Sequence, residues 1–68
     1  MQNIVTEDVL EGIANRRFLC LKEAANRLGL TYATGRRRIL REGLPIWTLR
    51  GRRYVRAADL ENPALRVP

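Results

Sequence analysis

Two short helices joined by a two-residue turn restrict the possible folds of this chain more than any other feature. Apolar residues recur at i, i+3, i+4 and i+7 over residues 21–28, and Gly29 follows where a left-handed residue can end a helix. Thr31 can cap a second helix that runs to about Arg41 and ends before Gly43. Because the turn is short and small alanines lie where the helices must pack, the sequence predicts a helix-turn-helix.

A basic hairpin is expected directly after the two helices. Apolar and polar residues alternate over residues 46–49, break at Arg50 and Gly51, and resume at Tyr54 and Val55 among further arginines. A helix-turn-helix followed by a basic hairpin is a winged helix-turn-helix. The expected fold class is therefore mainly α with a small β-hairpin.

The two ends of the chain add a helix and a tail. Thr6 can cap a helix with acidic residues in its first turn, so residues 1–15 are expected to form an extra N-terminal amphipathic helix. Its apolar stripe consists of Val5, Val9, Leu10 and Ile13. Residues 16–61 would form the winged helix-turn-helix domain, and residues 62–68, with two prolines and no periodicity, a flexible tail.

Charge is distributed unevenly along the chain and points to a polyanionic partner. Residues 1–15 carry three acids and no base, whereas residues 16–56 carry twelve Lys and Arg against two acids. The net charge of the 68 residues is +6. A compact basic body built almost entirely from arginine is typical of nucleic-acid-binding proteins, since guanidinium groups suit phosphate and guanine. A cationic surface that only confers solubility is the alternative.

Composition argues against several other classes of protein. Cys20 is the single cysteine and there is no histidine, so we expect no disulfide, metal or cofactor, and a reducing compartment. No nucleophile has a base and no carboxylates pair on a common face, so an enzyme is not expected. Apolar runs are too short to span a membrane and the N-terminus is acidic, which favours a cytoplasmic protein.

Three segments resemble a known family. "FLCLKEAANRLGL", "ILREGLP" and "LRGRRYVRAADLE" resemble, in this order, the pattern of excisionase-like winged helices, which are relatives of the MerR DNA-binding domain. The resemblance covers residues 18–61. It implies a recombination directionality factor that binds and bends double-stranded attachment-site DNA and directs a tyrosine integrase toward excision. It also implies a bacterial or phage-encoded, nucleoid-associated protein. Transcriptional regulators and phage DNA-packaging recognition subunits share this scaffold and remain alternatives.

The chain departs from the family pattern in three places. Cys20 stands where the family usually has Thr or Ser as helix N-cap, opposite Glu23, and a thiol is a poor acceptor. Gly35 stands where an apolar residue is usual, and the downstream apolar positions fit only if one residue is inserted, which moves the β-branched position onto Arg36. Residues 1–15 have no counterpart in the family.

Helical geometry divides the arginines of the second helix into two groups. At 100° per residue, Tyr32, Arg36, Ile39 and Leu40 share one arc that is expected to face the core. The opposite arc, which we expect to read bases in the major groove, holds Thr34, Arg37, Arg38 and Arg41. Gly35 is expected near the DNA-facing arc, where its small size would let the backbone approach the duplex. A merely solvated charged face is the alternative.

The remaining DNA contacts are assigned to the hairpin and to backbone-binding residues. Arg50, Arg52 and Arg53 surround the hairpin tip, where they can reach a minor groove or its phosphates. Residues predicted to contact the DNA backbone are Lys22, Tyr32 and Arg36. Trp47 is expected in the core rather than as a stacking surface for bases.

The N-terminal stripe must be buried somewhere, and two placements are open. It can fold back on its own domain, or it can dock on the next protomer to give a head-to-tail homo-oligomer on DNA. The acidic residues of this segment would repel DNA but attract a basic neighbour.

Overall fold

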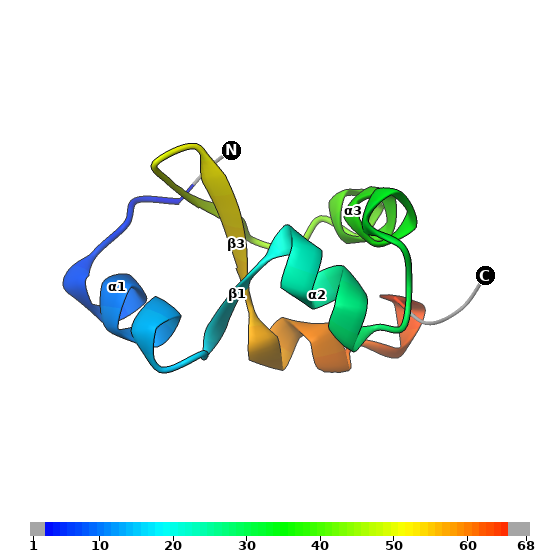
Figure 1. Ribbon diagram of the computed structural model, residues 1–68, viewed down its shortest axis with the longest axis horizontal. Coiled ribbons are helices and arrows are strands. Elements are labelled where there is room, and N and C mark those ends of the chain that lie inside the picture. The colour runs from blue at the N-terminus through cyan, green and yellow to red at the C-terminus, as the bar shows by residue number, and fades with distance from the viewer. Residues whose placement is uncertain (1–2, 66–68) are drawn as a thin grey trace.

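The computed structural model describes residues 3–65 and contains three α-helices and a three-stranded antiparallel sheet, followed by two short 3-10 helices (Figure 1). The elements, in chain order, are α1 (Glu7–Ala14), β1 (Phe18–Cys20), α2 (Leu21–Arg27), α3 (Tyr32–Arg41), β2 (Trp47–Leu49), β3 (Arg52–Arg56), η1 (Ala57–Glu61) and η2 (Pro63–Leu65).

The sheet has one strand more than the expected hairpin. β3 lies in the centre, with β1 antiparallel on one side and β2 antiparallel on the other. Leu19 of β1 is opposite Val55 of β3, so two buried side chains meet across the pair. β1 was not expected, because three residues are too few to show an alternating pattern.

The predicted hairpin is confirmed, and its turn explains why the strands reverse at Arg50 and Gly51. Both residues have positive φ angles, 51° and 80° respectively. Two successive left-handed residues form the tight turn whose twist matches that of the flanking strands. Leu49 and Arg52 are therefore paired directly across the tip.

The helix starts follow the predicted capping. Thr6 and Thr31 each accept a hydrogen bond from the backbone N–H three residues later, at 3.4 Å. Cys20 occupies the N-cap of α2 without any such bond, and its thiol lies 4.0 Å from a carboxylate oxygen of Glu23. α2 thus begins without the side-chain acceptor that stabilises the other two helices.

All three helices end in the same way, with a left-handed residue after the C-cap. Gly29 and Gly43, with φ angles of 73° and 69°, take this position after α2 and α3. After α1 it is taken by Arg16 with φ 67°. In each case the left-handed residue and its successor donate to carbonyls of the last turn, as Arg16 and Arg17 do to Ile13 and Gly12.

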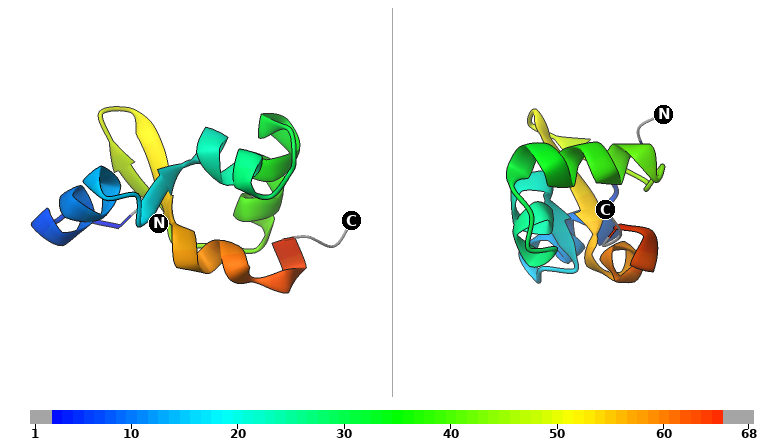
Figure 2. Two further views of the ribbon diagram at one scale, coloured as in Figure 1. Left: turned by 60° about the horizontal axis from the view of Figure 1, so that its bottom comes forward. Right: turned by 90° about the vertical axis from the view of Figure 1, so that its right-hand side faces the viewer.

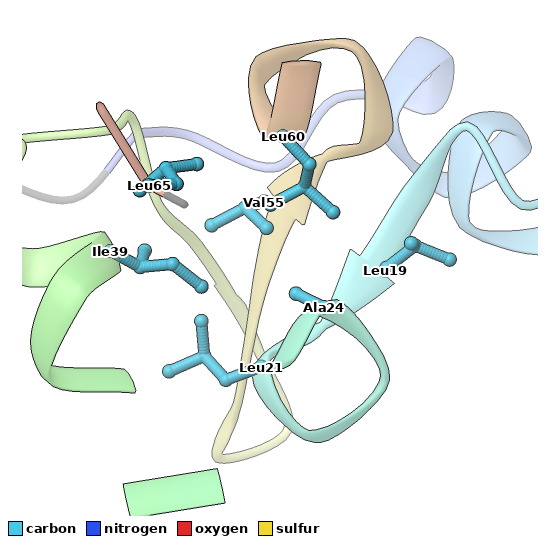
Figure 3. Close-up of a cluster of buried hydrophobic side chains, with 7 residues drawn as sticks. All are labelled: Leu19, Leu21, Ala24, Ile39, Val55, Leu60 and Leu65. Atoms are coloured by element: carbon cyan, nitrogen blue, oxygen red, sulfur yellow. The ribbon is translucent and has the colours of Figure 1, made fainter. Parts of the chain in front are cut away.

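The core lies between the sheet, the two central helices and the C-terminal turns (Figure 3). Its buried residues are Leu19, Leu21, Ala24, Ile39, Val55, Leu60 and Leu65. Leu65 is fully buried, so the expectation of a loose tail is wrong for residues 62–65; residues 66–68 of that prediction lie outside the described part. η2 lacks the length to show periodicity, which is why the sequence gave no signal of its packing.

Close packing of α2 against α3 depends on Gly35. A Cβ at this position would lie 2.3 Å from the Cβ of Ala25 and 2.8 Å from its Cα. Gly35 is buried at the helix crossing, so the expectation that it lies near the DNA-facing arc is wrong. The missing side chain lets the two helix backbones approach each other.

The N-terminal segment folds back on its own domain. Gly12 of α1 packs against the ring of Phe18 in β1, and Asn3 bridges to Trp47 beside the sheet edge (Figures 1 and 2). Within the predicted stripe only Val9 is buried, whereas Leu10 is 45% exposed. Val9 is therefore not available for self-association, and Leu10 is the stripe residue that faces solvent most openly.

Within residues 3–65, no helix is both long enough and apolar enough to cross a lipid bilayer.

Candidate nucleic-acid interface

A basic groove lies between the start of α2, the start of α3 and the hairpin tip. It has a volume of about 770 Å³ and is open to solvent. Figure 2, left, shows the hairpin tip and the helix pair rising on the same side of the molecule. The charged residues that line it are Lys22, Glu23, Arg36, Arg52 and Arg53, with Asn26 and Tyr32 as polar neighbours. Four cations thus face one carboxylate.

The one carboxylate of the groove is partly neutralised by a cation outside it. Glu23 accepts a hydrogen bond from the guanidinium of Arg16, which belongs to the turn after α1. Both side chains are substantially exposed, so the pair adds little stability. The pair matters more for ligand binding than for stability, because a paired carboxylate repels an anionic ligand less than a free one does.

The buried arc of α3 differs from the expected one by roughly 100°, or one residue step. Gly35 and Ile39 are buried, whereas Tyr32 is 52% and Leu40 is 41% exposed. Large apolar residues were assumed to face the core, and this rule put Leu40 on the wrong side. The helix instead buries its glycine, because close contact with Ala25 determines its rotation.

This rotation affects two residues of the predicted base-reading set, Arg38 and Thr34. Arg38 is half-buried and its Nη1 donates to the backbone carbonyl of Leu65 at 3.1 Å, so it points to the C-terminal turn. Thr34 is half-buried as well, and its hydroxyl accepts a hydrogen bond from the Thr31 hydroxyl at 3.1 Å. Assigning Arg38 to the open face of α3 was wrong, whereas the role predicted for Thr34 stays a prediction.

Arg36, in contrast, is more exposed than expected. It was placed at the core edge, but it is exposed and lines the basic groove together with Tyr32. Arg37 is exposed on the outer side of α3. Arg41 is also exposed and lies 3.3 Å from a carboxylate oxygen of Glu42, a surface pair that leaves most of its guanidinium open to solvent.

One row of α3 faces the hairpin. Tyr32, Arg36 and Leu40 are spaced four residues apart and therefore lie along one side of the helix. Tyr32 and Arg36 line the basic groove, Leu40 lines a second groove beside it, and Arg53 lines both. Arg53 of β3 is thus the hairpin residue that runs along this row.

The three hairpin arginines do not form one patch. Arg53 is opposite Thr48 and Arg52 opposite Leu49, so they start from opposite faces of the hairpin. Arg52 nevertheless borders the basic groove at the tip, where Gly51 leaves room. Arg50 lines a different hollow, between the hairpin and α1.

Trp47 is part of the packing rather than a free stacking surface. Its ring meets the ring of Phe18 edge to face, with centroids 4.9 Å apart. The guanidinium of Arg56 lies 5.4 Å from the Trp47 ring centroid and is also bonded to Asp59 at 3.0 Å. The guanidinium of Arg56 is therefore held by Trp47 and Asp59. Sequence reasoning missed this structural role.

Asn26 is a further groove residue that the sequence analysis missed. It follows Lys22 by four residues on α2, so both lie on the side of that helix that borders the groove. An amide can donate to phosphate or pair with a base, and the helical spacing from Lys22 was the signal that could have found it.

The chemistry of the groove suits an anionic ligand held by hydrogen bonds. Within residues 3–65 there is no cluster of three side chains able to hold a metal ion. Guanidinium and ammonium groups offer many donors and no acceptor, so they match phosphate oxygens. No protein-family model, curated protein or solved structure matches this chain.

Proposed function

We propose that this protein binds double-stranded DNA as a winged helix-turn-helix, with α3 in the major groove and the hairpin against the adjacent minor groove or its phosphates. The single observation that supports this most is the groove where Lys22, Arg36, Arg52 and Arg53 come together from three elements. Cations that are far apart in the sequence but converge on one open surface favour a polyanion as ligand.

In this proposal Arg36 and Arg37 replace Arg37 and Arg38 as the central contacts of α3. Arg37 is on the outer side of the helix and Arg36 lies between it and the hairpin, so both can reach a duplex laid across this face. Arg41 extends the same face by one turn. Arg38 is bonded to Leu65 and contributes to folding instead.

The class of DNA-binding protein is proposed from the resemblance of residues 18–61 to excisionases. On this basis the chain is a recombination directionality factor that binds adjacent copies of a site, bends attachment-site DNA and acts with an integrase. A transcriptional regulator on the same fold would instead occupy a promoter. Footprinting separates the two, since a ladder of protected sites favours the first and one symmetric pair favours the second.

The direct test is DNA affinity of matched arginine variants, measured by fluorescence anisotropy with a labelled duplex at about 0.1 M salt. Arg36→Ala and Arg37→Ala each remove one positive charge from the proposed interface. Arg38→Ala removes the same charge from the same helix and is the control. We expect the first two to weaken binding by about tenfold, and the third by about twofold or less.

Two results would contradict the proposal. Absence of any salt-dependent affinity for duplex DNA would discard DNA binding altogether. A loss for Arg38→Ala equal to that for Arg36→Ala, in a variant whose circular dichroism shows it folded, would show that net charge rather than this face determines binding.

A further inference from the structure

Four large hydrophobic side chains are exposed among residues 3–65, and two of them, Leu10 and Leu40, lie on distant surfaces. Ile4 and Leu10 lie in the N-terminal segment, while Tyr32 and Leu40 lie on α3. The first surface is acidic and the second is basic. Exposed apolar groups surrounded by charges of opposite sign are typical of two faces that bind each other.

The surface on α1 has Leu10 at its centre. Leu10 is 45% exposed and borders the same hollow as Glu7, Asp8 and Glu11. Among the described residues, none of these three carboxylates takes part in an ion pair. On one side of Leu10, α1 therefore presents three unpaired carboxylates, while on its other side Leu10 borders the hollow lined by Arg50 and Arg52.

The surface on α3 is its counterpart. Leu40 is 41% exposed at the rim of a groove of about 510 Å³ whose other walls include Leu44, Pro45 and Ile46. Arg53 lines this groove. Arg37 and Arg41 are exposed on the same helix. A groove with apolar walls on one side and an arginine on the other, beside two further exposed arginines of α3, is the kind of site that Leu10 and its carboxylates would fit.

The two surfaces of one chain cannot meet. α1 and α3 lie at opposite ends of a molecule that is 35 Å long, as Figures 1 and 2 show. A contact between them must therefore join two copies. Because the two faces differ, a single contact leaves one face free on each copy, and its repetition extends into an open chain wherever the rotation between copies does not close a ring.

We propose that α1 of one copy docks on α3 of another, with Leu10 in the groove beside Leu40 and its carboxylates against the arginines. The docked helix would cover Arg37 and Arg41, which belong to the proposed DNA-binding face. Self-association and DNA binding then exclude each other, because the DNA-binding face is covered in the oligomers. The competition rests on the proposed function, whereas the contact between copies does not.

Complementary charge reversals test the contact without DNA. The first variant, Glu7→Arg with Glu11→Arg, loses the acidic face but keeps α3. The second, Arg37→Glu with Arg41→Glu, loses the basic face but keeps α1. In sedimentation velocity at about 0.05 M salt, we expect the wild type to form oligomers of increasing size and each variant alone to be monomeric. An equimolar mixture should again form oligomers of increasing size, since the intact α1 and α3 faces still pair and the two reversed faces, a basic α1 and an acidic α3, are complementary to each other.

Single substitutions separate the apolar contact from net charge. Leu10→Ser should weaken wild-type self-association by about tenfold, because the leucine no longer leaves water on docking. Glu11→Arg should also weaken it, whereas Glu61→Arg, the same charge change at an exposed residue of η1, should not. A monomeric wild type, or variants that still form oligomers alone, would overturn the proposal.

Addition of duplex DNA tests the competition. We expect DNA to dissociate the oligomers and to form protein–DNA complexes in which α1 of one copy does not contact α3 of another. Oligomers that persist or grow on DNA would overturn mutual exclusion and favour a filament on the duplex. Self-association without any DNA binding would refute the proposed function and leave the contact intact, while DNA binding by a strictly monomeric protein would do the reverse.

Discussion

Gly35 is buried where α3 crosses α2, with no room for a side chain. Any side chain at position 35 would clash with Ala25, so glycine allows α2 and α3 to pack closely. This contact determines which side of α3 is buried. The cost of a glycine inside a helix, about 1 kcal/mol relative to alanine, is offset by the close packing that it permits.

Gly35→Ala should therefore destabilise the protein although alanine is the better helix former. We expect a loss of about 2–3 kcal/mol in the free energy of unfolding, measured by urea denaturation, because the added Cβ would overlap both atoms of Ala25. Gly29→Ala is the control. It has a positive φ but nothing within 4 Å of the added atom, so its cost should be about 1 kcal/mol, from backbone strain alone.

Arg16 occupies a position where glycine would be favoured. Its φ of 67° is left-handed, and its only strong side-chain contact is the exposed pair with Glu23. Arg16→Gly should raise the free energy of unfolding by about 0.5–1 kcal/mol, since the relief of strain exceeds the value of a surface pair. Arg17→Gly lacks the positive φ and should be neutral or destabilising. Equal effects of the two changes would contradict this explanation.

The C-terminal turn η2 packs against α3 and supports its position. Leu65 is fully buried and its carbonyl accepts a hydrogen bond from Arg38, so the C-terminal turn and the candidate interface helix share one set of contacts. A segment that appeared to be a tail is in fact part of the support for α3.

Leu65→Ala should lower the free energy of unfolding by about 2–4 kcal/mol, as is usual for a leucine removed from a core. Thermal melting followed by circular dichroism measures this loss. Pro63→Ala, an exposed neighbour in the same turn, is the control and should change stability by well under 1 kcal/mol. A negligible effect of Leu65→Ala would show that η2 is not part of the core.

The whole molecule is electrically polarised along its length. α1 at one end carries three acids, while α3, with its exposed arginines, lies toward the other end (Figure 1). Such a separation orients the protein in the field of a polyanion, with its acidic end pointing away. Bound DNA would release about one counterion for each phosphate that a cation neutralises.

The salt dependence of DNA affinity should reflect this count. The six cations proposed for the interface are Lys22, Arg36, Arg37, Arg41, Arg52 and Arg53. If each meets a phosphate, the slope of log K against log salt is about −5, and removing Arg53 should reduce its magnitude by about 1. Arg38→Ala should leave the slope unchanged. A slope near zero would show that DNA is not bound through this surface.

Local patterns determined most of the elements of this protein. The threonine caps, the glycines after α2 and α3, and the Arg50–Gly51 turn all have the positions that the sequence predicts. Each of these features depends on contacts within a few residues, so neighbouring residues in the sequence are sufficient to predict it. The uneven charge is of the same kind, because it requires no knowledge of the fold.

The tertiary structure decided everything that depends on residues far apart in the chain. β1 exists because β3 provides its hydrogen-bond partners, and Leu65 is buried because the core leaves a space that it fills. The rotation of α3 was misjudged because apolar character was taken to mean burial, whereas the contact of Gly35 with Ala25 determines the buried face. Which arginines share a groove follows from that rotation, and a helical wheel drawn for one helix contains no information about its neighbour.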